Sequence, residues 1–146
     1  MDINVKPMDV GDIEAAYLIH LESFPDDHMS ENGFREEVQG KSRKYYIATV
    51  GALPAGYVGV WNTGSDLSVI SIAVRPDYRR LGVADELMER VKKQARMDNI
   101  MAISLEVCED NIPAIELYKK CGFIITNTRK NYYKNNRAAY IMWLYL

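Results

Sequence analysis

The sequence predicts one α/β domain whose mixed sheet joins antiparallel hairpins to a central strand–helix–strand crossover. Two patterns lead to this fold class: apolar residues alternate with polar ones along several short segments, as in half-buried strands, and recur every three or four positions along others, as in amphipathic helices. The 146 residues are 48% apolar and 26% charged, which suits a single globular core. We expect one domain over residues 1–146, because no repeat, low-complexity tract or linker divides the sequence.

The chain is expected to begin with a strand and a helix. Residues 3–5 alternate like a short strand, and residues 13–21 carry apolar side chains at helical spacing. Asp9 or Asp12 would cap that helix, and the helix should stop near Pro25.

The segment PDDHMSENG is rich in turn formers and charges, which predicts a surface loop, and a short amphipathic segment around Phe34 and Val38 follows it. Three strands are then expected at residues 45–50, 55–61 and 67–74. The connections GALP and NTGSD favour tight hairpins, so these strands should form an antiparallel meander.

Helices and strands alternate in the second half of the chain. Asn111 is a suitable cap for the second of its helices, and Gly122 a suitable end. The spacing of apolar residues predicts helices at 82–97 and 112–121 and strands at 100–107, 123–126 and 138–144.

Composition excludes several classes of protein. A formal charge of −2 and a pI near 5.7 provide no positive field for nucleic acid, and no apolar run is long enough to span a membrane. The N-terminus lacks a secretory signal, so we expect a cytoplasmic protein. Cys108 and Cys121 are too few for a disulfide framework and should be buried small hydrophobes. The two histidines, His20 and His28, are expected to face solvent.

The stretch SIAVRPDYRRLGVA at residues 71–84 is a strand that runs through a short polar loop directly into a helix. The first four amide groups of a helix have no partner within it and carry partial positive charge. Gly82 removes the side chain that would block an approaching ligand, and Arg79 and Arg80 add charge beside the amides. The segment therefore predicts a site for an anion such as a pyrophosphate.

Within this stretch, R-R-L-G-V-A after a strand ending in I-A-V resembles the Q/R-x-x-G-x-G/A loop of the GNAT acetyltransferase superfamily, with Arg79, Gly82 and Ala84 in the signature positions. The resemblance implies the GNAT fold, a central mixed and mostly antiparallel sheet flanked by helices on both faces. It also implies acetyl-CoA as co-substrate, without a metal, with its pantetheine arm along Ile72 and Val74. The fingerprint G-x-G-x-x-G and the phosphate loop of nucleotide hydrolases are missing from the sequence, which favours CoA over NAD or ATP.

Glu106 and Tyr118 are the candidates for the chemistry. Acetyl transfer to an amine needs a base for the amine, donors for the developing oxyanion and a proton for the leaving thiolate. Glu106 interrupts an apolar strand, where burial of a carboxylate is costly, and Tyr118 lies on the apolar face of the next helix. The residues alone leave two alternatives open: Glu106 as a structural carboxylate paired with an arginine, and Tyr118 as ordinary core packing.

The run L-E-V-C-E-D-N-I-P-A-I-E-L-Y-K-K-C-G-F is similar to the L-E-V-x-x-x-N-x-x-A-I-x-L-Y-x-x-x-G-F segment of the ribosomal-protein alanine N-acetyltransferases. The resemblance implies that Glu106 is the general base, acting directly or through a water, that Tyr118 protonates the CoA thiolate and that Asn111 contacts the cofactor. Together the two resemblances imply a set of cofactor-binding residues: Ile72, Ala73, Val74, Arg79, Arg80, Leu81, Gly82, Val83, Ala84, Asp85, Asn111 and Tyr118.

Two further segments imply a peptide substrate. The segment T-R-K-N-Y-Y-K at residues 128–134 is similar to the R/K-x-N-Y-Y segment of protein N-terminal acetyltransferases, which implies that Tyr132 and Tyr133 hold the substrate backbone. Phe24 and Pro25 resemble the F-P that borders the pocket for the N-terminal residue in the same enzymes. The implied partner is a protein N-terminus, with a ribosomal protein among the candidates.

Two other functions are open. One is acetylation of a small amine such as a polyamine or an aminoglycoside, against which Asn131, Tyr132 and Tyr133 argue because they suit a peptide groove. The other is a CoA-binding sensor without turnover, against which the presence of both Glu106 and Tyr118 argues.

Overall fold

The computed structural model describes residues 2–133 and 136–146, and its helices and strands follow the predicted order. The elements of the first half are β1 (Ile3–Pro7), α1 (Ile13–Ser23), α2 (Glu31–Val38), β2 (Arg43–Val50), β3 (Leu53–Asn62) and β4 (Leu67–Val74). Those of the second half are α3 (Val83–Met97), β5 (Ala102–Cys108), α4 (Ile112–Lys120), β6 (Ile124–Arg129) and β7 (Ala139–Tyr145).

The largest difference from prediction lies before α2. The last residues of the predicted surface loop form the first turn of this helix, because Ser30 caps it: the Ser30 hydroxyl accepts a hydrogen bond from the Gly33 amide at 3.0 Å. The other ends differ from prediction by only a few residues, as helix and strand ends commonly do.

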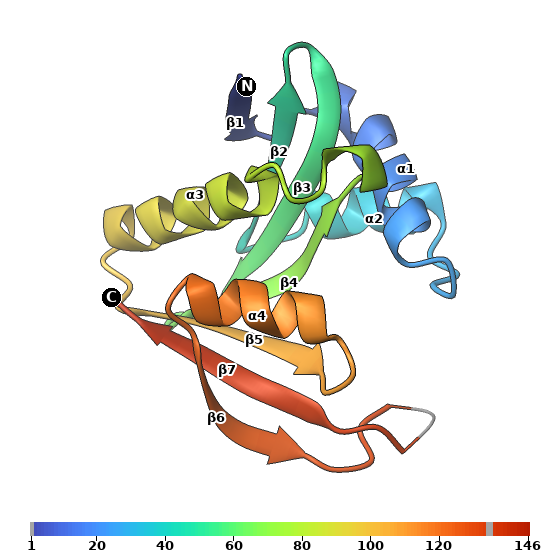
Figure 1. The fold of residues 1–146 in the computed structure, drawn as a ribbon. Coiled ribbons are helices and arrows are strands. Elements are labelled where there is room, and N and C mark those ends of the chain that lie inside the picture. Colours follow the sequence, from blue (N-terminus) through green and yellow to red (C-terminus); the bar gives the residue numbers. More distant parts are fainter. Residues whose placement is uncertain (1, 134–135) are drawn as a thin grey trace.

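Seven strands form one sheet in the order β1-β2-β3-β4-β5-β7-β6. All neighbours are antiparallel except β4 and β5, which are parallel and joined by the crossover helix α3. Helices α3 and α4 cover one face of the sheet, and α1 and α2 lie on the other (Figure 1). The predicted α/β class with a mostly antiparallel mixed sheet is confirmed.

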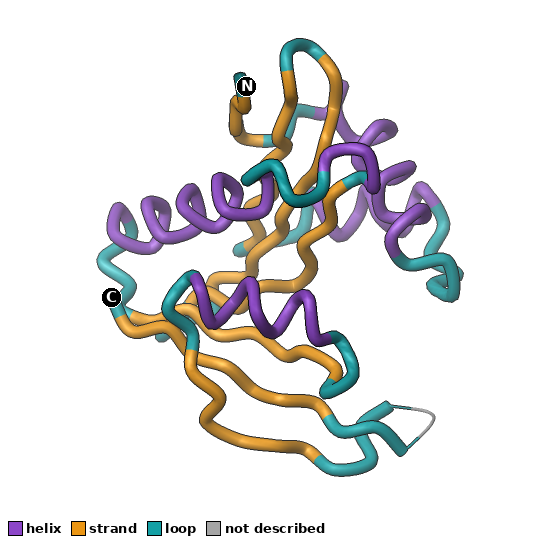
Figure 2. Tube along the Cα trace, viewed as in Figure 1, coloured by secondary structure: helices purple, strands orange, loops and turns teal. Residues whose placement is uncertain are grey.

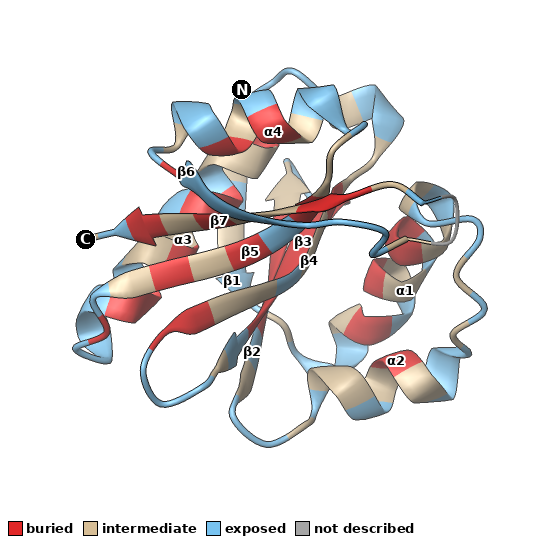
Figure 3. Ribbon diagram, turned by 90° about the horizontal axis from the view of Figure 1, so that it is seen from below, coloured by how far each residue is buried: buried red, intermediate tan, exposed pale blue. Residues whose placement is uncertain are grey.

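Each face of the sheet has its own apolar core. The core under α3 and α4 includes Leu87, Tyr118 and Met142, and the core under α1 and α2 includes Phe34 and Tyr57. The main contacts of α1 and α2 with the sheet are to β2, β3 and β4. The strand β6 is exposed along its whole length (Figure 3). None of the helices that the structure describes combines the length and the apolar composition needed to cross a bilayer.

The parallel strands β4 and β5 separate soon after they meet. They pair only at Leu67 with Ile103 and at Ser68 with Ser104, and beyond this point they diverge (Figure 2). Ile70 is the extra residue of a β-bulge, because Gly59 pairs with Ser71 whereas the next β3 residue pairs with Val69. A bulge bends its strand. The carboxyl halves of β4 and β5 therefore form the two walls of an open cleft.

Candidate active site

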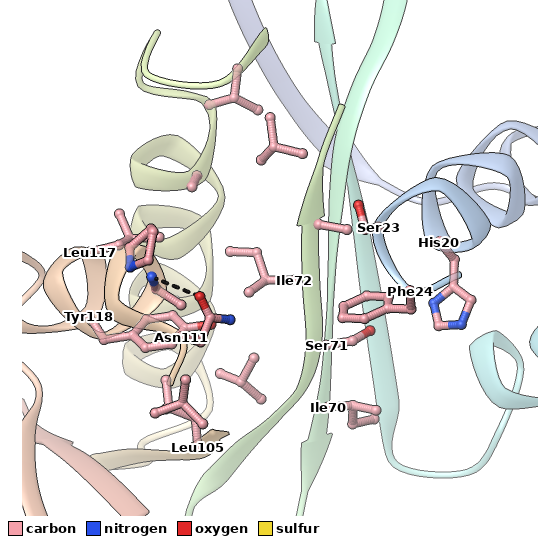
Figure 4. Close-up of a pocket in the computed structure, with 18 of the residues that line it drawn as sticks. His20, Ser23, Phe24, Ile70, Ser71, Ile72, Leu105, Asn111, Leu117 and Tyr118 are labelled. Carbon is pink, nitrogen blue, oxygen red and sulfur yellow. Dashed lines mark hydrogen bonds between the residues drawn. The ribbon is translucent and has the colours of Figure 1, made fainter. Parts of the chain in front are cut away.

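The cleft between β4 and β5 holds a cavity of about 1160 Å³, which reaches through the sheet from the α3–α4 side to the α1–α2 side (Figure 4). Nearly all the predicted cofactor residues line it, and Leu81, which is exposed, is the one that does not. The predicted residues on the cavity wall are Ile72, Ala73, Val74, Arg79, Arg80, Gly82, Val83, Ala84, Asp85, Asn111 and Tyr118.

The first turn of α3 opens onto the cavity. Gly82 caps this helix with φ +92°, a left-handed conformation that residues with a side chain adopt only at a cost, and Arg80 has φ +61°. A Cβ atom at Gly82 would meet only Ile3 Cδ1, at 4.0 Å, so within the protein the backbone angle and not crowding calls for glycine. No side chain of the described residues caps the helix by a hydrogen bond, so its first amides are available to bind an anion.

The end of β4 presents main-chain groups to the same cavity. The Arg75 amide donates to Ala55 of β3, so the alternation along a strand directs the backbone of Ala73 to β3 and that of Ile72 and Val74 to the cleft. Arg79 confirms this for Val74, because its Nε donates to the Val74 carbonyl at 3.0 Å. This bond also holds the arginine side chain at the wall of the cavity.

Glu106 enters the cleft from β5. Its neighbours Leu105 and Val107 are buried beneath α4, so the alternation of the strand directs Glu106 to the other face. The expectation of a buried carboxylate is wrong: the Glu106 side chain is 35% exposed and its Oε1 lies 3.3 Å from Arg129 Nη1. An ion pair this exposed contributes little stability, so the arginine partner alone does not account for the glutamate.

Tyr118 enters from α4, on the opposite face of the sheet. The residue is 7% exposed, and burial, with a smaller contribution from Cys121, raises the pKa of its phenol to about 12. Burial favours the neutral form, so the phenol keeps its proton at physiological pH. Its ring packs against Phe123 at a centroid distance of 5.9 Å. Tyr118 is thus a core residue that also places a protonated phenol on the cavity wall.

Asn111 acts as the cap of α4, as predicted. Its Oδ1 accepts from the Ala114 amide at 3.3 Å. The amide nitrogen of Asn111 is directed away from the helix toward the open side of the cleft (Figure 4). It is therefore placed to donate to a ligand in the cavity.

The α1–α2 side of the cavity is lined by Phe24, whose ring lies 5.0 Å from that of His20. Pro25 is exposed and does not line the cavity. The expectation for His20 is wrong, because this residue is only 6% exposed, whereas His28 faces solvent as predicted. His20 is buried because both its ring nitrogens have hydrogen-bond partners, which removes most of the cost of leaving water.

The cysteines also differ from prediction. Cys108 and Cys121 are free thiols that are half-buried and not fully buried. Cys108 ends β5 on the same side as Glu106, and the Cys121 sulfur lies 3.8 Å from Asp85 in the first turn of α3.

Tyr132 and Tyr133 lie on the loop after β6, and their rings make an edge-to-face contact at 5.1 Å. Tyr133 lines the main cavity, and both tyrosines line an adjoining cavity of about 560 Å³. Glu106 lines both cavities, and its carboxylate raises the pKa of Tyr132. The Arg129 guanidinium lies 5.6 Å from the Tyr132 ring centroid. Lys134, the last residue of the predicted segment, is outside the described residues.

Charges divide the main cavity into two halves. On its described wall the lysine and arginine residues, Arg79, Arg80 and Lys120, gather at the α3–α4 end. Among the carboxylates, Asp27, Glu37 and Glu106 line the other end, and only Asp85 lies with the cations. Such a cavity suits a ligand that is anionic at one end and a second ligand that is cationic.

Sequence reasoning missed four residues at or behind the α1–α2 end of the cavity, where the cationic ligand would bind: Asp27, Tyr57, Ser71 and Arg129. Ser71 is the first residue of the recognised stretch at 71–84, and Arg129 belongs to the recognised R-K-N-Y-Y run, so membership of a motif was a usable signal for both. Asp27 and Tyr57 have none, because their roles depend on contacts with His20, 7 and 37 residues away in sequence.

Comparison with known proteins agrees with this geometry. Residues 12–123 match the family described as acetyltransferase (GNAT) family. The chain is 31% identical to a provisionally named ribosomal protein bS18-alanine N-acetyltransferase of Bacillus subtilis (strain 168), over 96% of this chain and 93% of the relative. It is 34% identical to the streptothricin acetyltransferase of Escherichia coli, over 98% of this chain and 95% of the relative.

Among solved structures, the ribosomal-protein-S18-alanine N-acetyltransferase of Escherichia coli superposes with a TM-score of 0.88 at 27% identity. The match covers 99% of this chain and 94% of that one.

Proposed function

Because this chain belongs to the acetyltransferase (GNAT) family, we propose that it transfers the acetyl group of acetyl-CoA to the free α-amino group of a protein N-terminus. The observation that carries the proposal is the placement of Glu106 and Tyr118 on one cavity from opposite faces of the sheet. A proton acceptor on one face and a proton donor on the other suit an amine that enters from the first side and a thiol that leaves from the second.

The α3–α4 end of the cavity, called the anion-binding end below, fits the cofactor. Acetyl-CoA, when bound, supplies an activated acetyl thioester. The uncapped amides of α3 and the guanidinium of Arg79 suit its pyrophosphate, and the main-chain groups of Ile72 and Val74 suit the amide groups of its pantetheine arm. The Asn111 amide nitrogen adds a donor from the opposite wall.

The chemistry follows from the side chains on the cavity wall. An α-ammonium group has a pKa near 8, so Glu106 needs to remove only a weakly held proton, directly or through a water. A main-chain N–H of β4 would stabilise the negative charge that develops on the acetyl oxygen. Tyr118, which is protonated at physiological pH and whose pKa burial raises to about 12, gives its proton to the thiolate as the bond between the acetyl carbon and the sulfur breaks.

A second candidate function is acetylation of a small cationic amine. The resemblance to a streptothricin acetyltransferase favours it. So do the three carboxylates at the α1–α2 end of the main cavity, called the acceptor end below. The adjoining cavity favours a peptide instead, because it continues past Glu106 along Tyr132 and Tyr133. This adjoining cavity would bind the second and later residues of a peptide substrate. A small amine would leave it empty.

A panel of acceptors separates the two functions. Short peptides that begin with the bS18 sequence, and variants at positions one and two, would be compared with streptothricin, spermidine and free lysine, with release of the CoA thiol as the readout. We expect kcat/KM to be highest for a peptide with a free N-terminus and acetylation to be lost when that terminus is blocked. Faster turnover of streptothricin or spermidine than of every peptide would contradict the proposal and support the second candidate.

A further inference from the structure

A chain of hydrogen bonds links the α1–α2 loop to the wall of the cavity. His20 Nε2 lies 2.8 Å from Asp27 Oδ2, and His20 Nδ1 lies 2.7 Å from the Tyr57 hydroxyl. That hydroxyl lies 2.9 Å from Ser71 Oγ. The middle of the chain is closed to water, since Tyr57 is fully buried and His20 nearly so. Ser71 is half-buried on the cavity wall, beside Phe24 (Figure 4).

The Asp27 carboxylate sets the direction of these bonds at one end. A hydrogen bond from the Met29 amide and a second from His20 hold the pKa of Asp27 below its usual range, so this group is ionised and only accepts. His20 Nε2 must therefore carry a proton and donate it to Asp27. In a neutral imidazole the other nitrogen, Nδ1, then has a lone pair and accepts.

The donor–acceptor direction of the first hydrogen bond fixes that of the next bonds, as far as Ser71 on the cavity wall. Because Nδ1 accepts, the Tyr57 hydroxyl donates its one proton to His20, and burial raises the pKa of Tyr57 so that this proton is retained. The Tyr57 oxygen can then only accept from Ser71, so the Ser71 proton is directed away from the cavity. What Ser71 presents to the cavity is a pair of oxygen lone pairs.

We propose that Ser71 binds the acceptor substrate through its Oγ, which accepts a hydrogen bond from the substrate's amine nitrogen or its first peptide N–H. Asp27, His20 and Tyr57 are positioning residues that fix the direction of the Ser71 hydroxyl. The proposal rests on acetyl transfer to an amine and holds for a peptide and for a small cationic acceptor. Ser71 and Glu106 would then hold the amine between the two walls of the cleft.

The test compares Ser71→Ala with Ser71→Thr, which keeps the hydroxyl. The acceptor is whichever amine of the panel the wild-type protein acetylates fastest. Loss of a hydrogen bond to a charged donor should raise the acceptor KM about 10-fold in Ser71→Ala, and the acetyl-CoA KM should stay within about twofold. Ser71→Thr should restore most of the acceptor affinity. Ser23→Ala is the local control, because Ser23 lines the same cavity while its hydroxyl is buried and has no hydrogen-bond partner among the described residues.

Tyr57→Phe tests the positioning role, because it leaves Ser71 in place but removes the group that directs its proton. The acceptor KM should rise in this variant even where thermal unfolding shows that the fold is intact. If these hydrogen bonds only stabilise the fold, Tyr57→Phe should lower Tm and leave the acceptor KM unchanged.

Three outcomes overturn the assignment or its premise. An unchanged acceptor KM in Ser71→Ala overturns the role of Ser71 alone. An equal rise in Ser23→Ala overturns it too, because the effect would then belong to any hydroxyl in the cavity. If the wild-type protein acetylates no amine of the panel, the proposed function fails and the Ser71 assignment fails with it.

Discussion

The two ends of the cavity are built in different ways. The α3–α4 end is formed mainly by one continuous stretch of chain, from Ile72 to Asp85, and its binding groups are mostly backbone amides and carbonyls. The α1–α2 end is assembled from α1, β4, β5 and the loop after β6, and its binding groups are side chains. A backbone site depends on local conformation, whereas a side-chain site depends on the tertiary contacts that hold each side chain in place.

The difference has consequences for substitution. Changes at the anion-binding end should act through backbone angles and affect the cofactor alone. Changes at the acceptor end should act through single polar atoms and affect the amine alone. The proposed catalytic residues, Glu106 and Tyr118, line the cavity from opposite faces of the sheet, and their substitution should affect the rate more than the binding of either substrate.

The largest effect is expected for Tyr118→Phe. The ring and its contact with Phe123 are kept, but the proton for the thiolate is lost, so kcat should fall about 10³-fold. No hydrogen bond joins the Tyr118 hydroxyl to another of the described residues, so the free energy of unfolding should barely change. Stopped-flow detection of the CoA thiol and urea unfolding measure the two quantities.

A pH profile sharpens the assignment of Tyr118. With a pKa of about 12, the phenol stays protonated as pH rises, so it should cause no loss of wild-type activity up to about pH 10. A kcat in Tyr118→Phe close to that of the wild type would show that this tyrosine serves packing only.

Glu106→Gln should lower kcat less, by about 10²-fold at pH 7, because part of the amine is already neutral there. Below the amine pKa, near 8, the neutral fraction rises about tenfold per pH unit, so the rate of the variant should rise steeply with pH and then level off. The matched control is Arg129→Gln, which removes the partner of the ion pair and keeps the carboxylate. Equal losses in both variants would assign the effect to the ion pair and not to the base.

The anion-binding end was largely predictable from sequence. The need for glycine at position 82 and the uncapped start of α3 are local properties, and the stretch from residue 71 to 84 contains both. The strand and helix order was predictable for the same reason, since each element carries its own apolar periodicity.

The acceptor end was not predictable to the same extent. His20 was expected at the surface because a lone histidine on a helix gives no sign of its partners, and only the fold brings Asp27 and Tyr57 to its two nitrogens. Glu106 was expected to be buried because its strand is apolar, but α1 and α2 make their main sheet contacts with β2, β3 and β4, and the Glu106 side chain is 35% exposed. Local patterns do not report which face of a strand remains uncovered.

Gly82→Ala tests the backbone site, with Gly64→Ala as its matched control. Both glycines have left-handed angles, φ +92° and φ +99°, and neither has an atom closer than 4.0 Å to an added Cβ. Each substitution should therefore destabilise the fold by a similar amount, about 1–2 kcal/mol. Only Gly82→Ala should weaken acetyl-CoA binding, by about 10-fold in calorimetry, because the loop that aligns the α3 amides would relax. Equal affinities in the two variants would place the pyrophosphate elsewhere.

The smallest effect is expected for Tyr132→Ala, which tests whether the acceptor end extends into the adjoining cavity. Tyr132 is largely exposed and does not line the main cavity, so its loss should leave the acetyl-CoA KM unchanged. The KM of a long peptide should rise about fivefold, as is common when an aromatic contact in an interface is truncated. A small amine would not reach this cavity and should be acetylated as before. The change in KM for the long peptide, relative to that for the small amine, thus shows whether the acceptor extends past Glu106. Equal changes for the two acceptors would show that the adjoining cavity is not part of the substrate site.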